Sequence, residues 1–387
     1  MIERKKCLIF LRYYLPGFQS GGPVRSVSNL VDAIGDRFDF YIVTSNRDFL
    51  KAEPYDCVEA GWNVVGKAKV LYLEQNCLSV RLVRRLVMEI KPAVIYLNSF
   101  FDPSFSLPVL VLKTLRGASF PPVICAPRGE LAAGAMEQKT LRKRLYIFAF
   151  RLFGLPRKVA LHATSRQEAR DLRERLSEKS EVFLAANLFS RDAGLARSVL
   201  VGDHGNDGVF RLAFLSRIHP KKNLDFAIEC LHGVTGNVEF NIYGPVDDES
   251  YWHRCLRKAE KLPSNIKLNF HGPVAHSEVQ PTLQKNDLFF FPTKSENFGH
   301  VIIEALQAGL PVITSDRTPW NTLASLEIGA CLPLVNTSPF SDRINEISKW
   351  TDEDWHNFRS RLDGFLLSLA QNSNSEDEHV TMFTAAT

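Results

Sequence analysis

Short apolar segments of strand length alternate with amphipathic segments along most of this chain, and this alternation limits its folds more than any other feature. The apolar run 7–13, for example, is followed by residues 24–34, whose apolar side chains recur at helical spacing. Further apolar runs of strand length lie at 38–44, 70–73, 93–98, 123–126, 159–163 and 182–185. Apolar strands separated by amphipathic helices are typical of a parallel sheet covered by helices on both faces. We therefore predict an α/β fold.

The alternation stops once and then resumes, which predicts two domains. The interruption is rich in Gly, Asp and Asn, a composition typical of a loop. Strands are then expected at 209–215, 240–243, 266–270, 287–292 and 311–315, with helical patterns between them. We assign a Rossmann-like N-terminal domain to 1–190, a linker to 191–208, a second Rossmann-like domain to 209–350, and a C-terminal helix near the domain junction with a partly disordered tail to 351–387.

The composition excludes some classes of protein. With 47 basic and 43 acidic residues, the net charge of +4 is too weak to indicate a nucleic-acid partner. The seven cysteines are dispersed and form no C-x-x-C pair, which indicates free thiols in a reducing compartment. The N-terminus resembles a first strand rather than a signal peptide, and no uncharged apolar run reaches the roughly 18 residues of a membrane span. We expect a cytoplasmic protein.

The segment 287–309 predicts a strand, a polar loop and a helix that begins near residues 298–300. The first N–H groups of a helix have no intrahelical partners, so a helix start after the carboxyl end of a strand is a ready anion site. Glu296 and Glu304 bracket it, as suits a phosphorylated sugar or nucleoside. A buried strand–helix unit with two surface glutamates is an equally good interpretation of this segment alone.

The loop after the strand 209–215 carries Arg217 and Lys222, with Asn223 expected to cap the next helix. Two fixed cations there would clamp a diphosphate leaving group, although a solvated basic loop is the simpler interpretation. The acidic runs 247–249 and 352–354 precede helical patterns, so we interpret them as helix starts rather than a metal site.

Together these residues resemble glycosyltransferase family 4. The resemblance rests on the Arg217/Lys222 pair, on the Glu-x7-Glu spacing from Glu296 to Glu304, and on the Gly-Leu-Pro-Val-Ile segment that follows. It covers most of the chain and is densest in the second half. It implies a GT-B fold, in which two Rossmann-like doubly wound domains face each other across a cleft. In such a fold 1–190 would be the acceptor-side domain and 209–350 the donor-binding domain. It also implies retaining transfer of a sugar from a nucleotide-sugar donor, without a cofactor or an obligatory metal.

The resemblance implies roles for individual residues. Arg217 and Lys222 would neutralise the donor phosphates, Glu296 would hold hydroxyls of the transferred sugar, and Glu304 would bind the ribose hydroxyls. Arg217, Lys222 and Glu296 form the expected catalytic set. The backbone at the helix start would contact the phosphates or the sugar through Phe298, Gly299, His300 and Val301.

In the first half, Gly21 and Gly22 follow the first strand, where a glycine pair lets the backbone approach a ligand closely. In similar enzymes this loop reaches the donor phosphates or the acceptor, whereas a plain tight turn is the alternative.

Asn98 ends another strand. Arg128 and Glu130 lie in a Pro-Arg-Gly segment similar to that of enzymes that build bacterial surface polysaccharides, which would place them on the acceptor side. Many family members carry a histidine here, so the group that relays the acceptor's proton stays open, and so does a structural ion pair between Arg128 and Glu130.

Residues 139–158 are basic and aromatic. They predict either a core helix with solvated ends or a peripheral contact with an anionic membrane, at the inner face of the cytoplasmic membrane where a lipid-linked acceptor lies. The expected partners are a nucleotide-sugar donor and a glycan or lipid-linked acceptor in surface-polysaccharide assembly (capsule, exopolysaccharide or O-antigen). The alternatives are a non-hydrolysing nucleotide-sugar epimerase of the same fold and a catalytically silent nucleotide-sugar-binding subunit.

Overall fold

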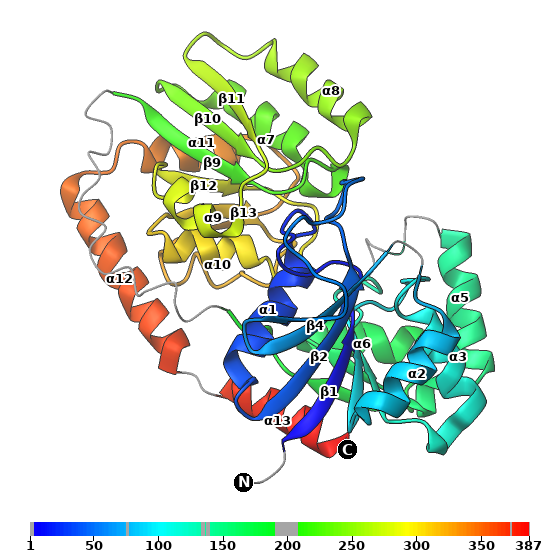
Figure 1. Ribbon diagram of the computed structural model, residues 1–387. Helices are drawn as coiled ribbons and strands as arrows, with labels where there is room; N and C mark the ends of the chain where they lie inside the picture. The colour runs from blue at the N-terminus through cyan, green and yellow to red at the C-terminus, as the bar shows by residue number, and fades with distance from the viewer. Residues whose placement is uncertain are drawn as a thin grey trace. The chain divides into compact units, whose positions relative to one another are not determined.

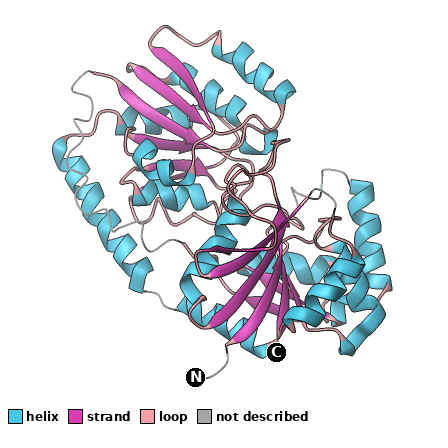
Figure 2. Ribbon diagram, viewed as in Figure 1, coloured by secondary structure: helices cyan, strands magenta, loops and turns pink. Residues whose placement is uncertain are grey.

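The computed structural model describes residues 4–74, 77–132, 136, 140–189, 208–371 and 374–386. The chain divides into two compact units, one of residues 1–190 with 373–387 and the other of residues 191–372. The linker predicted at 191–208 lies outside the described residues except for Gly208. Each unit contains a sheet with helices packed on it, as Figures 1 and 2 show.

The sheet of the first unit has eight strands in the order β3-β4-β2-β1-β5-β6-β7-β8. The strands are β1 (Lys5–Phe10), β2 (Phe38–Ser45), β3 (Trp62–Val65), β4 (Ala68–Leu73), β5 (Val94–Leu97), β6 (Val123–Cys125), β7 (Val159–Ala163) and β8 (Val182–Leu184). Neighbouring strands are parallel except for β3 and β4. The parallel strands confirm the prediction. β3 was not predicted, because it is a partly exposed edge strand interrupted by Asn63. It pairs through a tight turn at Gly66, whose φ is 57°.

The helices of the first unit cover both faces of this sheet (Figure 1). They are α1 (Gly22–Ile34), α2 (Val80–Ile90), α3 (Leu107–Arg116), α5 (Thr140–Leu152), α6 (Arg166–Arg175) and α13 (Asn374–Ala385), with short 3-10 turns at Gly117–Ser119 (η1) and Leu155–Arg157 (η2). Side chains of α1 and α13 share one buried apolar cluster with the sheet. Those of α2, α3, α5 and α6 belong to the other cluster.

Helix α13 corrects the expectation of a partly disordered tail. It belongs to the first unit. Its Met382 and Phe383 are buried, and the Phe383 ring lies 5.5 Å from that of Phe38 and 5.6 Å from that of Tyr96. The expectation was wrong because the segment is mostly polar. Its few apolar residues nevertheless fall on one face, and burial of that face on the sheet stabilises the helix.

The sheet of the second unit has six parallel strands in the order β11-β10-β9-β12-β13-β14. The strands are β9 (Phe210–Leu215), β10 (Val238–Tyr243), β11 (Ile266–Gly272), β12 (Leu288–Phe291), β13 (Val312–Ser315) and β14 (Gly329–Leu332). The helices are α7 (Leu224–Cys230), α8 (Glu249–Ala259), α9 (His276–Leu283), α10 (His300–Gln307), α11 (Ser338–Ile347) and α12 (Asp352–Gln371), with 3-10 turns at Pro220–Lys222 (η3) and Leu231–Gly233 (η4). The sequence did not predict β14 or α11.

In both sheets the chain first adds strands toward one edge, then returns to the middle and adds the remaining strands toward the other edge. In the first sheet the two halves meet between β1 and β5, and in the second between β9 and β12. In open α/β sheets, ligands bind outside the carboxyl ends of the strands at such a switch point. The loops that follow these four strands are therefore where a site is expected, and the polar residues predicted from the sequence lie in or beside them.

Candidate functional site

Lys222 and Glu296 meet at the switch point of the second sheet. Lys222 ends η3, after β9, and Glu296 lies in the loop after β12. The Lys222 Nζ donates a hydrogen bond to Glu296 Oε1, and only 15% and 12% of the two side chains are exposed. The ammonium group also lies 5.5 Å from the centre of the Phe291 ring. The structure thus joins two predicted site residues as an ion pair, which their separate predicted roles did not include.

Three further hydrogen bonds hold the two loops together. The backbone N–H of Lys294 and the Thr293 hydroxyl both donate to the Lys221 carbonyl, at 2.9 and 3.1 Å. The Asn223 side chain donates to the Pro292 carbonyl at 2.9 Å. Asn223 occupies the N-cap position of α7 but makes no side-chain cap, because its backbone is left-handed (φ 63°) and its amide satisfies a buried carbonyl instead.

Arg217 also pairs with a carboxylate. Its Nη1 lies 2.8 Å from Asp247 Oδ2, in the loop between β10 and α8. The acidic run 247–249 does begin a helix, but Asp248 is the residue that caps α8, by accepting from the Tyr251 N–H at 2.8 Å, whereas Asp247 pairs with Arg217. Sheet order could have identified Asp247, since β10 is the neighbour of β9. Both predicted cations therefore lie beside acidic groups.

His219 adds an imidazole to the same loop. Its Nδ1 accepts a hydrogen bond from the Lys221 N–H at 3.1 Å, so this nitrogen carries no proton. Burial is the largest influence on the ring and lowers the pKa of His219 below its ordinary value. The neutral ring leaves Nε2–H as a donor, which the sequence analysis did not foresee.

The start of α10 confirms the helix N-terminus predicted near residues 298–300. Gly299 occupies the N-cap position with φ 79°, and a Cβ there would lie 3.0 Å from the Ile302 side chain, so glycine fits best. The Trp320 indole N–H donates to the Phe298 carbonyl and holds the loop from the other side. His300 and Val301 then begin the helix, where backbone N–H groups lack intrahelical partners and suit an anion.

Glu304 lies in the second turn of α10 and is half-buried. Glu296 precedes the helix and Glu304 follows its start, so one loop–helix segment carries both carboxylates. The structure therefore keeps the predicted order of a carboxylate, a helix start and a second carboxylate.

In the first unit, the predicted residues gather at the carboxyl edge of the sheet. Asn98 is buried, and its Nδ2 donates to the Pro23 carbonyl at 3.2 Å. Its Oδ1 accepts from Arg128 Nε at 2.9 Å. Gly21, at the N-cap position of α1 with φ 74°, and Gly22 directly precede Pro23. Asn98 thus connects the glycine loop to Arg128.

Arg128 also anchors a buried polar chain. Its Nη1 donates to Asn187 Oδ1 and its Nη2 donates to the Tyr96 hydroxyl at 2.8 Å. The Tyr96 oxygen lies 2.7 Å from His162 Nδ1, and His162 Nε2 lies 2.8 Å from the Ala185 carbonyl. A carbonyl only accepts, so Nε2 carries the proton and Tyr96 donates to Nδ1. Burial accordingly lowers the pKa of His162 well below its usual range.

Glu130 has its own partners. Its carboxylate accepts from the Ser99 hydroxyl at 2.7 Å and from the N–H groups of Phe100 and Phe101 at 2.7 and 3.0 Å. Burial raises the pKa of Glu130, against the lowering effect of these hydrogen bonds. Within the described part of the chain no ion pair joins Arg128 to Glu130, which contradicts the purely structural ion pair considered for them.

Helix α5 forms most of the predicted segment 139–158. Ile147 and Phe150 are buried in the core, as a core helix requires, but the same helix also exposes large apolar side chains. Among the described residues, no helix has the length and apolar character needed to cross a membrane.

Known proteins resemble this chain in sequence and in fold. Residues 203–360 match the family model for "Glycosyl transferases group 1". A phosphatidyl-myo-inositol mannosyltransferase of Mycobacterium leprae is 28% identical over 137 residues, which are 34% of this chain and 35% of that protein. The match thus spans about a third of the length of this relative.

The fold similarity extends over nearly the whole chain. HepE of Anabaena, solved with UDP and glucose, matches with a TM-score of 0.69 at 14% identity, covering 99% of this chain and 100% of that one. WaaG, a glycosyltransferase involved in lipopolysaccharide biosynthesis, matches with a TM-score of 0.69 at 12% identity, covering 98% and 99%. The chain therefore has the predicted GT-B fold, and its residues 203–360 are similar to group 1 glycosyl transferases.

Proposed function

We propose that this protein is a retaining, metal-independent glycosyltransferase of the hexosyltransferase type. It moves a sugar from a nucleotide-sugar donor to a glycan or lipid-linked acceptor in the biosynthesis of a surface polysaccharide. The observation that supports this most is the Lys222–Glu296 pair at the switch point of the second sheet, in the segment that leads into α10. HepE was solved with UDP and glucose, which agrees with a nucleotide-sugar donor.

The chemistry of the site suits such a donor. Sugar transfer builds negative charge on the departing nucleoside diphosphate, and Arg217, Lys222 and the N-terminus of α10 supply positive potential for it. Glu296 accepts hydrogen bonds from hydroxyls of the transferred sugar, and Glu304 accepts them from the ribose. The proposal includes no metal or cofactor, and it assigns the phosphate charge to Arg217, Lys222 and the N-terminus of α10.

In the proposed step, the bond between C1 of the sugar and the phosphate oxygen breaks. A bond forms between C1 and the acceptor hydroxyl oxygen on the same face of the sugar, which retains the configuration. The acceptor's proton passes to the departing phosphate, so no separate enzymic base is needed. Lys222 lies where it would stabilise the phosphate that takes the proton.

On the acceptor side we propose Asn98, Arg128 and Glu130, with Gly21 and Gly22 approaching the donor phosphates. The bonds described above use three of the five N–H donors of Arg128, and we assign the others to acceptor hydroxyls. The name of the M. leprae relative includes a phospholipid, and WaaG acts in lipopolysaccharide biosynthesis, which supports a lipid-linked acceptor. We place the protein in the cytoplasm, with residues 139–158 in peripheral contact with the inner face of the membrane.

One incubation series separates this proposal from its alternatives. Donor sugars are supplied with and without acceptor, and nucleoside diphosphate and sugar products are measured. A transferase releases nucleoside diphosphate only with acceptor, an epimerase converts the donor alone, and a silent subunit does neither. The variant Lys222→Ala should lose turnover, whereas Lys221→Ala, which removes a neighbouring positive charge, should keep it. Turnover by Lys222→Ala at the normal rate would refute the site.

A further inference from the structure

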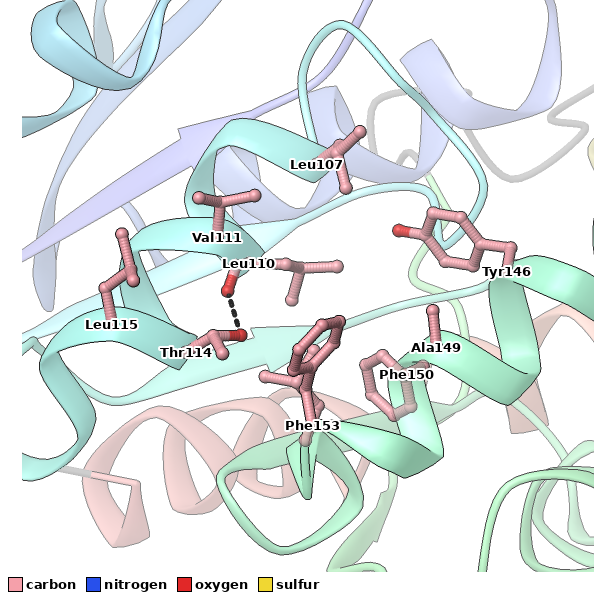
Figure 3. Close-up of a pocket in the computed structure, with 10 residues that line it drawn as sticks. Leu107, Leu110, Val111, Thr114, Leu115, Tyr146, Ala149, Phe150 and Phe153 are labelled. Atoms are coloured by element: carbon pink, nitrogen blue, oxygen red, sulfur yellow. Dashed lines mark hydrogen bonds between the residues drawn. The ribbon is translucent and has the colours of Figure 1, made fainter.

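We propose that an apolar groove between α3 and α5 holds one acyl chain of an anionic membrane phospholipid. The groove has a volume of about 240 Å³ and is partly open to solvent. Figure 3 shows Leu110 and Val111 of α3 facing Ala149 and Phe150 of α5 across it. A lining so poor in polar atoms suits a hydrocarbon chain.

The rim of the groove is unusually apolar for a protein surface. Leu115 on α3 and Phe153 just beyond α5 are 74% and 54% exposed. Single exposed apolar side chains are ordinary, but a contiguous group of them marks an interaction site. The groove and its rim are therefore one continuous apolar surface.

Helix α5 extends this surface with a second apolar stripe. Leu141, Leu145, Phe148 and Leu152 are 73%, 60%, 63% and 67% exposed. Their spacing of four, three and four residues places them on one side of the helix, adjacent to the side that lines the groove. A helix with such a stripe lies in the plane of a membrane interface. The groove would then open at the level of the acyl chains.

The charge around the groove identifies the lipid. Helices α3 and α5 and the turn η2 carry seven Lys or Arg residues and no Asp or Glu. Arg116, Arg142, Arg144 and Arg157 are exposed. Arginines beside a membrane surface attract anionic lipid headgroups. In a symmetric contact with a second copy, by contrast, this basic surface would meet itself, and like charges would repel.

Tyr146 determines which way the bound acyl chain runs in the groove. Among the described residues, its buried hydroxyl has no hydrogen-bond partner. Figure 3 shows this hydroxyl directed from α5 toward α3, near Leu107 and Leu110. A buried hydroxyl without a partner is unfavourable, and the ester carbonyl of a phospholipid would accept its proton. The glycerol end then lies at Tyr146 and the methyl end points toward Leu115 and Phe153.

This inference extends the proposed membrane contact of α5, but it concerns the first unit alone and does not depend on glycosyl transfer. The direct probe is dansyl-undecanoate below its critical micelle concentration, whose fluorescence rises in an apolar site. Wild-type protein should bind it at one saturable site. Ala149→Trp and Val111→Trp fill the groove from either side and should weaken binding by at least about tenfold. Since Val111 is 37% exposed, its variant tolerates the larger ring.

The matched control is Phe148→Ser on the exposed stripe, which should keep the affinity for the probe and lose binding to vesicles. Wild-type protein should bind phosphatidylcholine vesicles only when they contain phosphatidylglycerol, and Tyr146→Phe should weaken probe binding. Equal probe affinity in wild type and Val111→Trp would overturn the proposal. Equal binding to vesicles without phosphatidylglycerol would also overturn it, as would a wild-type dimer that Val111→Trp dissociates. Unchanged probe affinity in Tyr146→Phe would overturn the assigned direction of the chain.

Discussion

The Lys222 ammonium group and the Glu296 carboxylate form a largely buried ion pair between the loops that follow β9 and β12. The pair keeps two long side chains in place at the carboxyl edge of the sheet. In the account above, the cation of this pair meets the donor phosphate and the carboxylate meets the sugar. The same two residues therefore support both the local structure and the proposed reaction.

Replacement of Lys222 should separate these two effects. In Lys222→Ala, transfer should fall by about 10²–10³-fold, because a group that stabilises the developing charge is lost. The Glu296 carboxylate is also left without its cation, so the free energy of unfolding should fall by about 1–3 kcal/mol. Steady-state rates and urea unfolding measure the two losses. Lys222→Arg should restore stability more fully than rate, because a guanidinium keeps the charge but not the position. Full transfer by Lys222→Ala would rule out the phosphate role.

The hydroxyl of Tyr96 should hold the Arg128 side chain in position. Tyr96→Phe removes the group that accepts from Arg128 and donates to His162. We expect a loss of about 1–3 kcal/mol in the free energy of unfolding, because buried polar groups lose their partners. If Arg128 binds the acceptor, the KM for acceptor should rise while the KM for donor stays near its wild-type value. Tyr41→Phe, whose ring packs on Trp62 away from this chain, is the control. Equal rises in both KM values would contradict the assignment.

Helix α13 should be integral to the first unit. Phe383 is fully buried among the rings of Phe38, Phe40 and Tyr96. Phe383→Ala should therefore lower the free energy of unfolding by about 3–5 kcal/mol. Thr381→Ala, at an exposed position on the same helix, should change it little. Urea unfolding midpoints that coincide for the two variants would show that the helix does not contribute to the core.

Stability should decrease in mild acid because of buried histidines. Burial lowers the pKa of His379 to about 4, whereas the unfolded chain has about 6.5. Below pH 6.5 the unfolded chain binds a proton that the folded chain does not, so stability is greatest above pH 6.5 and falls as the pH decreases toward 4. Between pH 7 and 5 this histidine should lower the free energy of unfolding by about 2 kcal/mol, and His162 is shifted in the same direction.

The matched pair for this pH effect is His379→Phe and His356→Phe. The first variant removes a buried histidine and should show a shallower dependence of stability on pH. The second removes an exposed histidine on α12 and should keep the wild-type slope. Identical slopes for wild type and His379→Phe would contradict the buried neutral state.

The sequence predicted the helices and strands with a clear apolar pattern, such as the helical period of 24–34 and the apolar run 159–163, because burial imposes such patterns on the residues. It also predicted which loops carry the polar groups, since parallel strands end at a common edge. Strands β3 and β14 were missed because neither is a continuous run of large apolar residues: β3 contains Asn63 and has no buried residue, and β14 begins with Gly329 and Ala330. Helix α13 was missed because its stability comes from residues distant in the sequence, such as Phe38 and Tyr96.

The partners of the site residues could not be predicted for a similar reason. The Arg217–Asp247 pair depends on β9 and β10 being neighbours, and the hydrogen bond between Arg128 and Tyr96 depends on β5 and β6 being neighbours. Strand order is a property of the whole sheet, and no local pattern encodes it. The residue types at the site were therefore predictable, whereas their pairing required the fold.

The effect of nucleotide sugars on the thermal unfolding of wild type and Glu304→Ala tests the proposed donor site without any knowledge of the acceptor. A donor at about 100 times its Kd stabilises the folded state by about 2.7 kcal/mol. We predict that one of a panel of UDP-, GDP- and ADP-sugars raises the Tm of wild type, and that this rise, measured against the Tm of each protein without donor, is largely lost in Glu304→Ala. The same rise in both proteins, or no rise with any donor, would contradict the account.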